Sequence, residues 1–160
     1  MKNYEASRAI EKIENLLSSK NVAYEVINHE PSFTAQRTAK AEHIHGKEGA
    51  KVVIVTADGK DVMAVIPAPK KIDLAKMQSL LSARDVRLES EEKFAEIFPD
   101  CEVGAMPPFG FFYNVPVYVD QSLATSSQIV FNAGTHTMAI RMKYKDYEAI
   151  AMPKVRDISA

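Results

Sequence analysis

Apolar residues recur at every third or fourth position between residues 4 and 20, which is the spacing of one face of an α-helix. The residues of this face are Ala9, Ile10, Ile13, Leu16 and Leu17. Asn21 ends the periodic pattern, and the apolar run at residues 22–27 is typical of a β-strand. The sequence therefore predicts an amphipathic helix followed by a strand.

Two β-branched runs give the clearest pattern in the chain. Residues 51–55 and 62–66 flank Asp58-Gly59, a dipeptide that favours the tight turn of a β-hairpin. Both runs are apolar at nearly every position, whereas a half-exposed strand would alternate. They are predicted to be central strands that are covered on both faces.

Capping residues and shorter apolar runs predict the remaining elements. Asp73 and Ser90 are each expected to cap a helix, and the second helix should contain Phe94, Ile97 and Phe98. The other predicted segments are a short helix capped by Thr34, strands at 86–88, 115–119, 129–131 and 138–142, a long loop at 99–114 and a helical turn at 146–150. Helices that interleave with hairpins predict an α+β domain with a mixed sheet.

Composition and charge narrow the classes of function. The 160 residues have ordinary globular composition, with 46% hydrophobic and 26% charged residues, and they show no linker or repeat. We therefore expect one domain over residues 1–160. The net charge of −1 lacks the basic surplus of proteins that grip long duplex nucleic acid. Any nucleic-acid contact should be local, or supplied partly by another protein.

Cysteine usage and the absence of long apolar runs bear on location. The single cysteine, Cys101, excludes an internal disulfide and fits a reducing compartment. No secretory signal is visible, and no run reaches the ~18 apolar residues that a membrane span needs. We expect a cytoplasmic protein that does not act at a membrane.

A loop rich in glycine, proline and phenylalanine is the first candidate for a site. In residues 104–110, two prolines restrict the backbone and the flanking glycines allow turns that other residues avoid. Phe109 to Phe112 could form the wall of a small pocket. Spacing alone favours the alternative, a structural connector with core aromatics.

Lys51 and the turn at residues 132–137 are the other candidates. Lys51 opens a hydrophobic strand, where partial desolvation would suit it to bind an anion or a carbonyl oxygen. A lysine that extends to water is the alternative. Gly134 would let a ligand approach the backbone, and the turn's N–H groups could hold an oxyanion beside Thr135 and His136. A plain hairpin turn with an exposed histidine remains open.

Other chemistry finds little support in the sequence. His43 and His45 form a His-x-His pair without the third and fourth ligands of a zinc site, so no metal is expected. Cys101 has no evident activating partner in the sequence, which disfavours a thiolate nucleophile. The G-x-S-x-G, Walker and Rossmann motifs are absent.

Four blocks in order resemble the YbaK-like aminoacyl-tRNA deacylases, also called the prolyl-tRNA-synthetase-associated editing domain. The blocks are His29-Glu30-Pro31 with Thr34-Ala35, Gly49-Ala50-Lys51-Val52-Val53, Gly104-Ala105-Met106-Pro107-Pro108-Phe109-Gly110 and Phe131-Asn132-Ala133-Gly134-Thr135-His136. The resemblance covers roughly residues 22–153, after the N-terminal helix. It implies an α+β domain with a mixed, barrel-like sheet, flanking helices and a small amino-acid pocket.

The resemblance also implies an activity: hydrolysis of the ester between a mischarged amino acid and the acceptor end of a tRNA, without metal or cofactor. Lys51 matches the family's central lysine, which positions the tRNA end and the ester. Gly104 and Pro107 match its glycine–proline loop and Gly134 its glycine turn, whereas His136 matches only some members.

An aminoacyl ester is already activated, so positioned water or the neighbouring ribose hydroxyl could suffice, with the Gly134 and Thr135 amides holding the oxyanion. Phe33, Met106 and Phe109 are candidates for a size sieve, and Thr34 for substrate binding. A carrier such as an aminoacyl-tRNA synthetase could supply specificity for the tRNA. One alternative is a non-catalytic module that binds a tRNA end, a nucleotide or an amino acid, and another is a protein-interaction domain in a larger synthetase complex.

Overall fold

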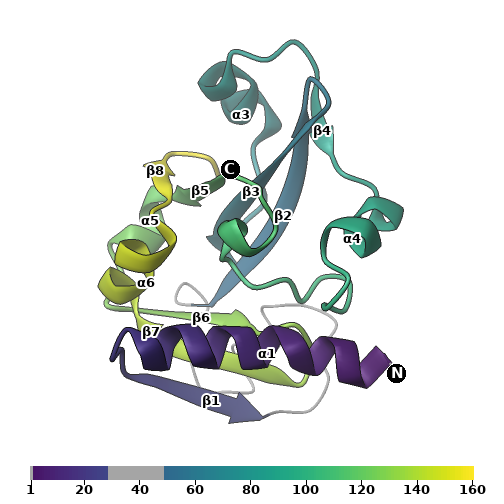
Figure 1. Ribbon diagram of the computed structural model, residues 1–160. Helices are drawn as coiled ribbons and strands as arrows, with labels where there is room; N and C mark the ends of the chain where they lie inside the picture. Colours follow the sequence, from purple (N-terminus) through teal and green to yellow (C-terminus); the bar gives the residue numbers. More distant parts are fainter. Residues whose placement is uncertain (1, 29–48) are drawn as a thin grey trace.

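A computed structural model describes residues 2–28 and 49–160 of the chain (Figure 1). The helices in these ranges are α1 (Lys2–Ser19), α3 (Leu74–Leu81), α4 (Glu91–Ile97), α5 (Gln121–Ala124) and α6 (Tyr144–Ala151), with a 3₁₀ turn, η1, at Gly110–Phe112. The strands are β1 (Tyr24–Asn28), β2 (Ala50–Ala57), β3 (Lys60–Pro67), β4 (Val86–Leu88), β5 (Val117–Asp120), β6 (Gln128–Asn132), β7 (Met138–Lys143) and β8 (Lys154–Arg156).

The strands form two separate sheets. Strands β1, β7 and β6 make an antiparallel sheet of three, and α1 runs alongside it (Figure 1). The order in the other sheet is β4-β2-β3-β5-β8, where β5 lies parallel to both β3 and β8. The predicted α+β class and mixed sheet are confirmed. The expected barrel is wrong, because a barrel needs a continuous ladder and only the bridge Gly49–Val130 links the described strands of the two sheets.

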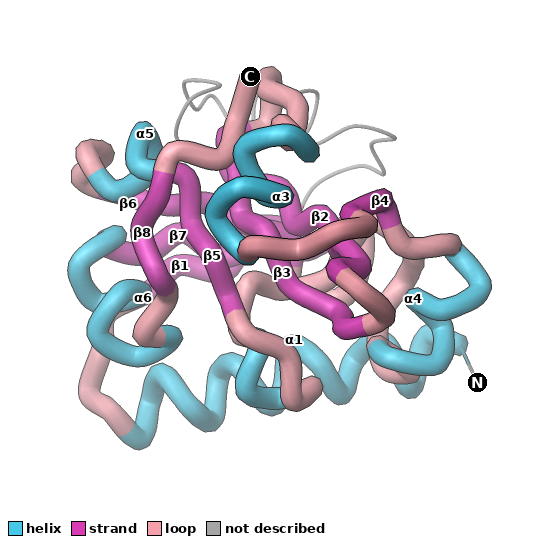
Figure 2. The backbone as a smooth tube through the Cα atoms, turned by 90° about the horizontal axis from the view of Figure 1, so that it is seen from above, coloured by secondary structure: helices cyan, strands magenta, loops and turns pink. Residues whose placement is uncertain are grey.

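Strand β3 separates two hydrophobic clusters, as predicted for a strand covered on both faces. Met63 and Val65 point into the main core, which also receives residues of α1, β6 and β7. Ala64 and Ile66 point to the other face and form a cluster with Met77 of α3. Figure 2 shows α3 lying over this sheet. Alternate side chains of one strand thus serve two cores.

The predicted hairpin and helix caps are confirmed. Asp58 and Gly59 have φ values of 50° and 85°, the left-handed geometry of the favoured hairpin turn. The Asp73 side chain accepts a hydrogen bond from the Lys76 amide at 3.1 Å, and Ser90 caps α4 in the same way. Phe98 was expected inside that helix, but it follows the last turn and is buried there.

Besides the 3₁₀ turn η1, one short strand and one short helix were not predicted. Strand β8 and the single turn α5 have three and four residues, too few for a periodic pattern to show. The buried Asp120 organises both. Its carboxylate accepts the Ser122 amide at the start of α5 and, at 3.0 Å each, the amides of Ile158 and Ser159 after β8. Burial alone would raise the pKa of Asp120, but a hydrogen bond from the Ser122 hydroxyl and those from the backbone amides lower it.

Gly110 is required for space rather than for an unusual backbone angle. Its φ is not among the positive values, which in the 104–110 loop occur only at Gly104. A Cβ at Gly110 would lie 2.3 Å from the Val115 carbonyl oxygen and 2.5 Å from Val117 Cγ2. The chain therefore folds back on Gly110 more closely than any side chain would allow.

Gly110→Ala should lower the free energy of unfolding by about 2–3 kcal/mol, because the loop must shift to relieve this overlap. Chemical denaturation measures the change. Gly59→Ala is the control: a Cβ there meets nothing within 4 Å, so only its positive φ should cost about 1 kcal/mol. Equal losses in both variants would contradict the packing explanation.

Candidate active site

The glycine–proline loop and the glycine turn, predicted separately, lie against each other. The Glu102 amide donates to the Gly134 carbonyl at 2.7 Å, and the Gly134 amide donates to the Ala105 carbonyl at 2.9 Å. Both glycines have left-handed φ values, 85° at Gly104 and 97° at Gly134, which favour glycine. We call residues 102–105 and 134–136 together the clasp.

Side chains strengthen the clasp. The Glu102 carboxylate Oε1 accepts the His136 backbone N–H at 2.7 Å. The His136 ring nitrogen Nε2 lies 2.7 Å from the Val103 carbonyl, and because a carbonyl can only accept, Nε2 carries the hydrogen. The imidazole also lies close to Gly104, where a Cβ would come within 3.4 Å of its Cε1. His136 is therefore held by both its backbone and its ring.

The expected oxyanion donors need one correction. The Gly134 amide already donates to Ala105, so it is not available to a substrate. The Thr135 amide has no acceptor among the residues that the structure describes. The Thr135 side chain turns back within the loop, with its hydroxyl 3.2 Å from that of Thr137. The Thr135 backbone N–H is therefore the donor that this turn can offer.

Buried aromatics support the loop from beneath. Phe109 is fully buried, with its ring centroid 5.5 Å from those of Phe131 and Tyr147. The Tyr147 hydroxyl donates to the Pro108 carbonyl at 2.7 Å. Met106 is 3% exposed and belongs to the same core. These contacts favour the interpretation of this loop as a structural connector with core aromatics. They also hold in place the loop that contains Gly104.

Lys51 lies near the start of β2, on the face turned away from the main core. Its cross-strand partner is Ile66 of the second cluster, and directly paired side chains share a face. The bridge Gly49–Val130 places this end of β2 beside β6, which leads into Gly134. The start of β2, which carries the candidate lysine, thus lies beside the middle of the strand that precedes the glycine turn.

Burial and a second lysine act on the Lys51 ammonium. Desolvation is the larger effect and the nearby charge of Lys71 the smaller, and both lower the pKa of Lys51 below its usual value of 10.5. The backbone of Lys71 is held in place, because its carbonyl accepts the Ala160 amide at 2.9 Å. The charge of Lys71 thus acts on Lys51, and an anion bound near both would relieve this repulsion.

Several sequence candidates lie outside the described residues: Phe33, Thr34, His43 and His45. Among the described residues, no group of three or more His, Cys, Asp or Glu side chains could hold a metal ion. Burial is the main cause that raises the pKa of the Cys101 thiol, to about 12, so the group is a neutral thiol at physiological pH. This agrees with the rejection of a thiolate nucleophile.

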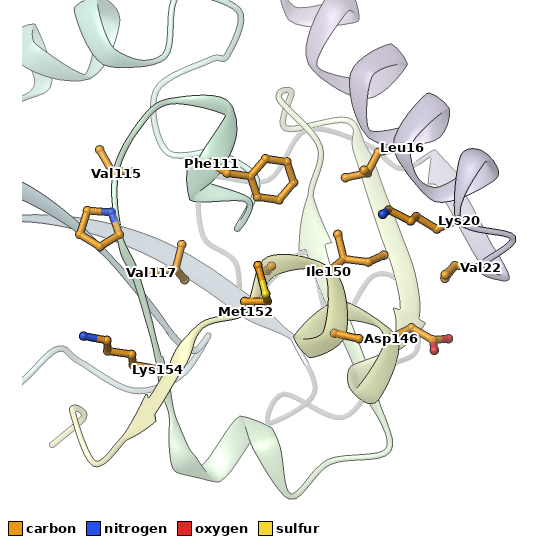
Figure 3. A pocket seen from close by; sticks show the side chains of 13 residues that line it. Leu16, Lys20, Val22, Phe111, Val115, Val117, Asp146, Ile150, Met152 and Lys154 are labelled. Atoms are coloured by element: carbon orange, nitrogen blue, oxygen red, sulfur yellow. The ribbon is translucent and has the colours of Figure 1, made fainter.

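A cavity of about 810 Å³ lies elsewhere, between the end of α1, β5 and α6. Figure 3 shows Phe111, Ile150 and Met152 at its centre, with Lys20 and Lys154 on opposite sides. Neither Lys51 nor a residue of the clasp lines it. Nothing in the apolar pattern predicted this hollow, since its walls come from elements far apart in the sequence.

In the described part of the chain, no helix combines the length and the apolar character needed to cross a membrane.

Comparison with known proteins places these features in a family. The family described as "Aminoacyl-tRNA editing domain" matches residues 29–150. The multifunctional Ser/Thr-tRNA deacylase ProXp-y of Escherichia coli (strain K12) is 27% identical over 145 residues, 88% of this chain and 86% of that protein. A proline–tRNA ligase of Heliobacterium modesticaldum is 28% identical over 113 residues, 69% of this chain but 19% of the ligase.

Solved structures share the fold. A candidate trans-editing enzyme for prolyl tRNA synthetase has a TM-score of 0.82 at 20% identity, covering 95% of this chain and 97% of that one. The hypothetical protein APE2540 has a TM-score of 0.84 at 21% identity, covering 93% and 99%.

Lys51→Met should leave the protein as stable as the parent or more so at pH 7, because it removes a partly desolvated, repelled ammonium and keeps the apolar stem. A lowered pKa means that the folded state disfavours the charged form. The gain should therefore be present at neutral pH and vanish as pH rises through the lowered pKa towards 10.5.

Thermal and chemical unfolding at several pH values measure this effect. Lys143→Met, at an exposed position of β7, is the matched control and should change the free energy of unfolding by less than about 0.5 kcal/mol. A clear loss of stability in Lys51→Met alone would assign Lys51 a structural role instead.

Proposed function

We propose that this chain removes a small amino acid, such as Ala, Cys, Ser or Thr, from the tRNA acceptor end. The chain belongs to the aminoacyl-tRNA editing domain family and is therefore a deacylase of mischarged aminoacyl-tRNA. The observation that carries this proposal is the clasp, which joins the glycine–proline loop to the glycine turn and orients one backbone donor. The shared core of α1 and both sheets supports treating residues 1–160 as a single editing domain.

Hydrolysis of the aminoacyl ester requires little of the protein beyond positioning of the reacting groups. A water molecule, oriented by the protein or by the neighbouring ribose hydroxyl, attacks the ester carbonyl carbon and forms a tetrahedral oxyanion. The Thr135 N–H donates to that oxyanion, the bond to the ribose oxygen breaks, and the proton lost by the nucleophile ends on that oxygen. With water as the nucleophile, the products are the free amino acid and the uncharged tRNA. The residues invoked require no metal or cofactor.

Lys51 would hold the acceptor end. A lysine is a compact cation that suits a phosphate, and the neighbouring charge of Lys71 favours an anion in the same region. The chain's net charge of −1 fits a protein that contacts only the terminal nucleotides. Bound phosphate would also offset the desolvation and repulsion that lower the pKa of Lys51.

The amino-acid sieve stays a proposal for Phe33, with Thr34 as a further substrate contact, whereas Met106 is only 3% exposed and would shape the sieve indirectly. Phe109 is fully buried among other aromatics, which supports an indirect role in holding the loop. One methylene changes the preference of such a pocket by only about 10–200-fold, so a second site that admits small residues is useful to translation. The name of the Escherichia coli relative makes Ser and Thr the first substrates to test.

A synthetase is the proposed carrier of tRNA specificity. A related segment occupies 19% of a proline–tRNA ligase, which shows that such a domain can be part of a synthetase. A domain with a net charge of −1 has no basic surplus for binding tRNA and would gain from docking on a synthetase. Because tRNA is charged in the cytoplasm, we propose that the protein acts there.

Incubation with tRNAs charged with Ala, Cys, Ser or Thr should release at least one of these amino acids, and Lys51→Ala should lower kcat/KM by about 100-fold or more, through lost positioning of the ester. Loss of the ester bond is the measurement. Lys143→Ala, on the opposite sheet, should stay within about twofold of the parent, which controls for a general loss of positive charge.

No release from any of the four tRNAs, with retained binding of a charged tRNA, would replace the deacylase proposal with a non-catalytic binding module. Release that is unchanged in Lys51→Ala would keep the activity but remove Lys51 from its mechanism.

A further inference from the structure

We infer that Glu102 is a positioning residue for deacylation: it fixes the two peptide groups on either side of Thr135 and so aims the Thr135 N–H at the developing oxyanion. This inference rests on the proposed function. It concerns a residue that neither the sequence patterns nor the family resemblance singled out.

The first peptide group is held by the Glu102 backbone. The Glu102 N–H donates to the Gly134 carbonyl at 2.7 Å. That carbonyl and the Thr135 N–H belong to one planar peptide unit, in which the C=O and N–H bonds point in opposite directions. A bond that pulls the Gly134 oxygen towards Glu102 therefore turns the Thr135 N–H away from Glu102.

The second peptide group is held by the Glu102 side chain. Its Oε1 accepts the His136 N–H at 2.7 Å, and that N–H shares a peptide unit with the Thr135 carbonyl. One residue thus grips the unit before Thr135 and the unit after it. Neither φ nor ψ of Thr135 can rotate freely while both bonds persist.

The turn needs this support because Gly134 would otherwise be loose. Glycine at a φ of 97° has wide conformational freedom, and no regular strand or helix includes residues 133–137. The bonds that restrain it span 34 positions of sequence between Glu102 and His136 and 33 between Val103 and His136. A hydrogen bond to a carboxylate is stronger than one to a neutral acceptor, which suits a position exposed to water.

Glu102 is exposed, so its removal should spare the core. The residues that anchor the clasp from beneath, Ala105 and Ala133, are fully buried and remain in place without the carboxylate. The backbone bond from Glu102 to Gly134 also survives a side-chain change. A substitution at Glu102 therefore removes one of the two grips on Thr135 and leaves the fold.

The kinetic test compares Glu102→Ala, which has no acceptor, with Glu102→Gln, whose side-chain carbonyl can still accept the His136 N–H. The oxyanion exists only in the transition state, so Glu102→Ala should lower kcat about tenfold while KM stays within about twofold. Glu102→Gln should retain at least about a third of the parent kcat. Glu11→Ala, an exposed position on α1, is the matched control and should match the parent.

Amide hydrogen exchange tests the grip without any activity. The His136 amide should exchange about tenfold faster in Glu102→Ala than in the parent or in Glu102→Gln, with melting temperatures within about 2 °C of each other. If the parent releases no amino acid while the exchange of the His136 amide responds as stated, the proposed function fails. The restraint of His136 by the Glu102 carboxylate is then still supported.

Three results would overturn the inference. The first is an unchanged kcat in Glu102→Ala, and the second is an equal loss in the Gln and Ala variants. The third is a fall in melting temperature that accompanies the loss of activity, which would make Glu102 merely structural.

Discussion

Four hydrogen bonds between residues 102–105 and 134–136 form the constraint on which the candidate site depends. Neither segment lies in a helix or strand, so no regular ladder fixes their geometry. Ala105 and Ala133 anchor the two segments in the core, and the four bonds orient the backbone beside them. Because the peptide group is planar, a hydrogen bond that holds the Gly134 carbonyl also fixes the direction of the Thr135 N–H. Catalysis by orientation needs this kind of rigidity.

Local signals in the sequence were sufficient for most of the secondary structure. The Asp58-Gly59 turn and the caps at Asp73 and Ser90 are decided by residues close in sequence, and all formed as predicted. The separation into two sheets was not predictable in this way. It depends on parallel pairing of β5 with β3 and β8, which brings together segments with no shared local pattern. Strand β8 and helix α5 were too short to leave a periodic signal.

The candidate site was also predictable from the sequence only in part. Residue type and order identified Lys51, Gly104, Gly134 and His136, and the structure joins the last three in one clasp. Sequence reasoning could not tell that the Gly134 amide is occupied, because its acceptor lies in a different loop. Glu102 looks like any exposed acid in the sequence. Only the tertiary contact with His136 distinguishes it from the other carboxylates.

The most direct test is a measurement of where the substrate binds. A stable adenosine analogue that carries serine through an amide instead of an ester would be titrated into the labelled protein and followed by NMR. The account predicts that the Thr135 amide and the Lys51 ammonium shift together, at one ligand concentration. Shifts confined to residues around Phe111 and Met152, with Thr135 and Lys51 unmoved, would place the ligand in the other cavity and contradict it.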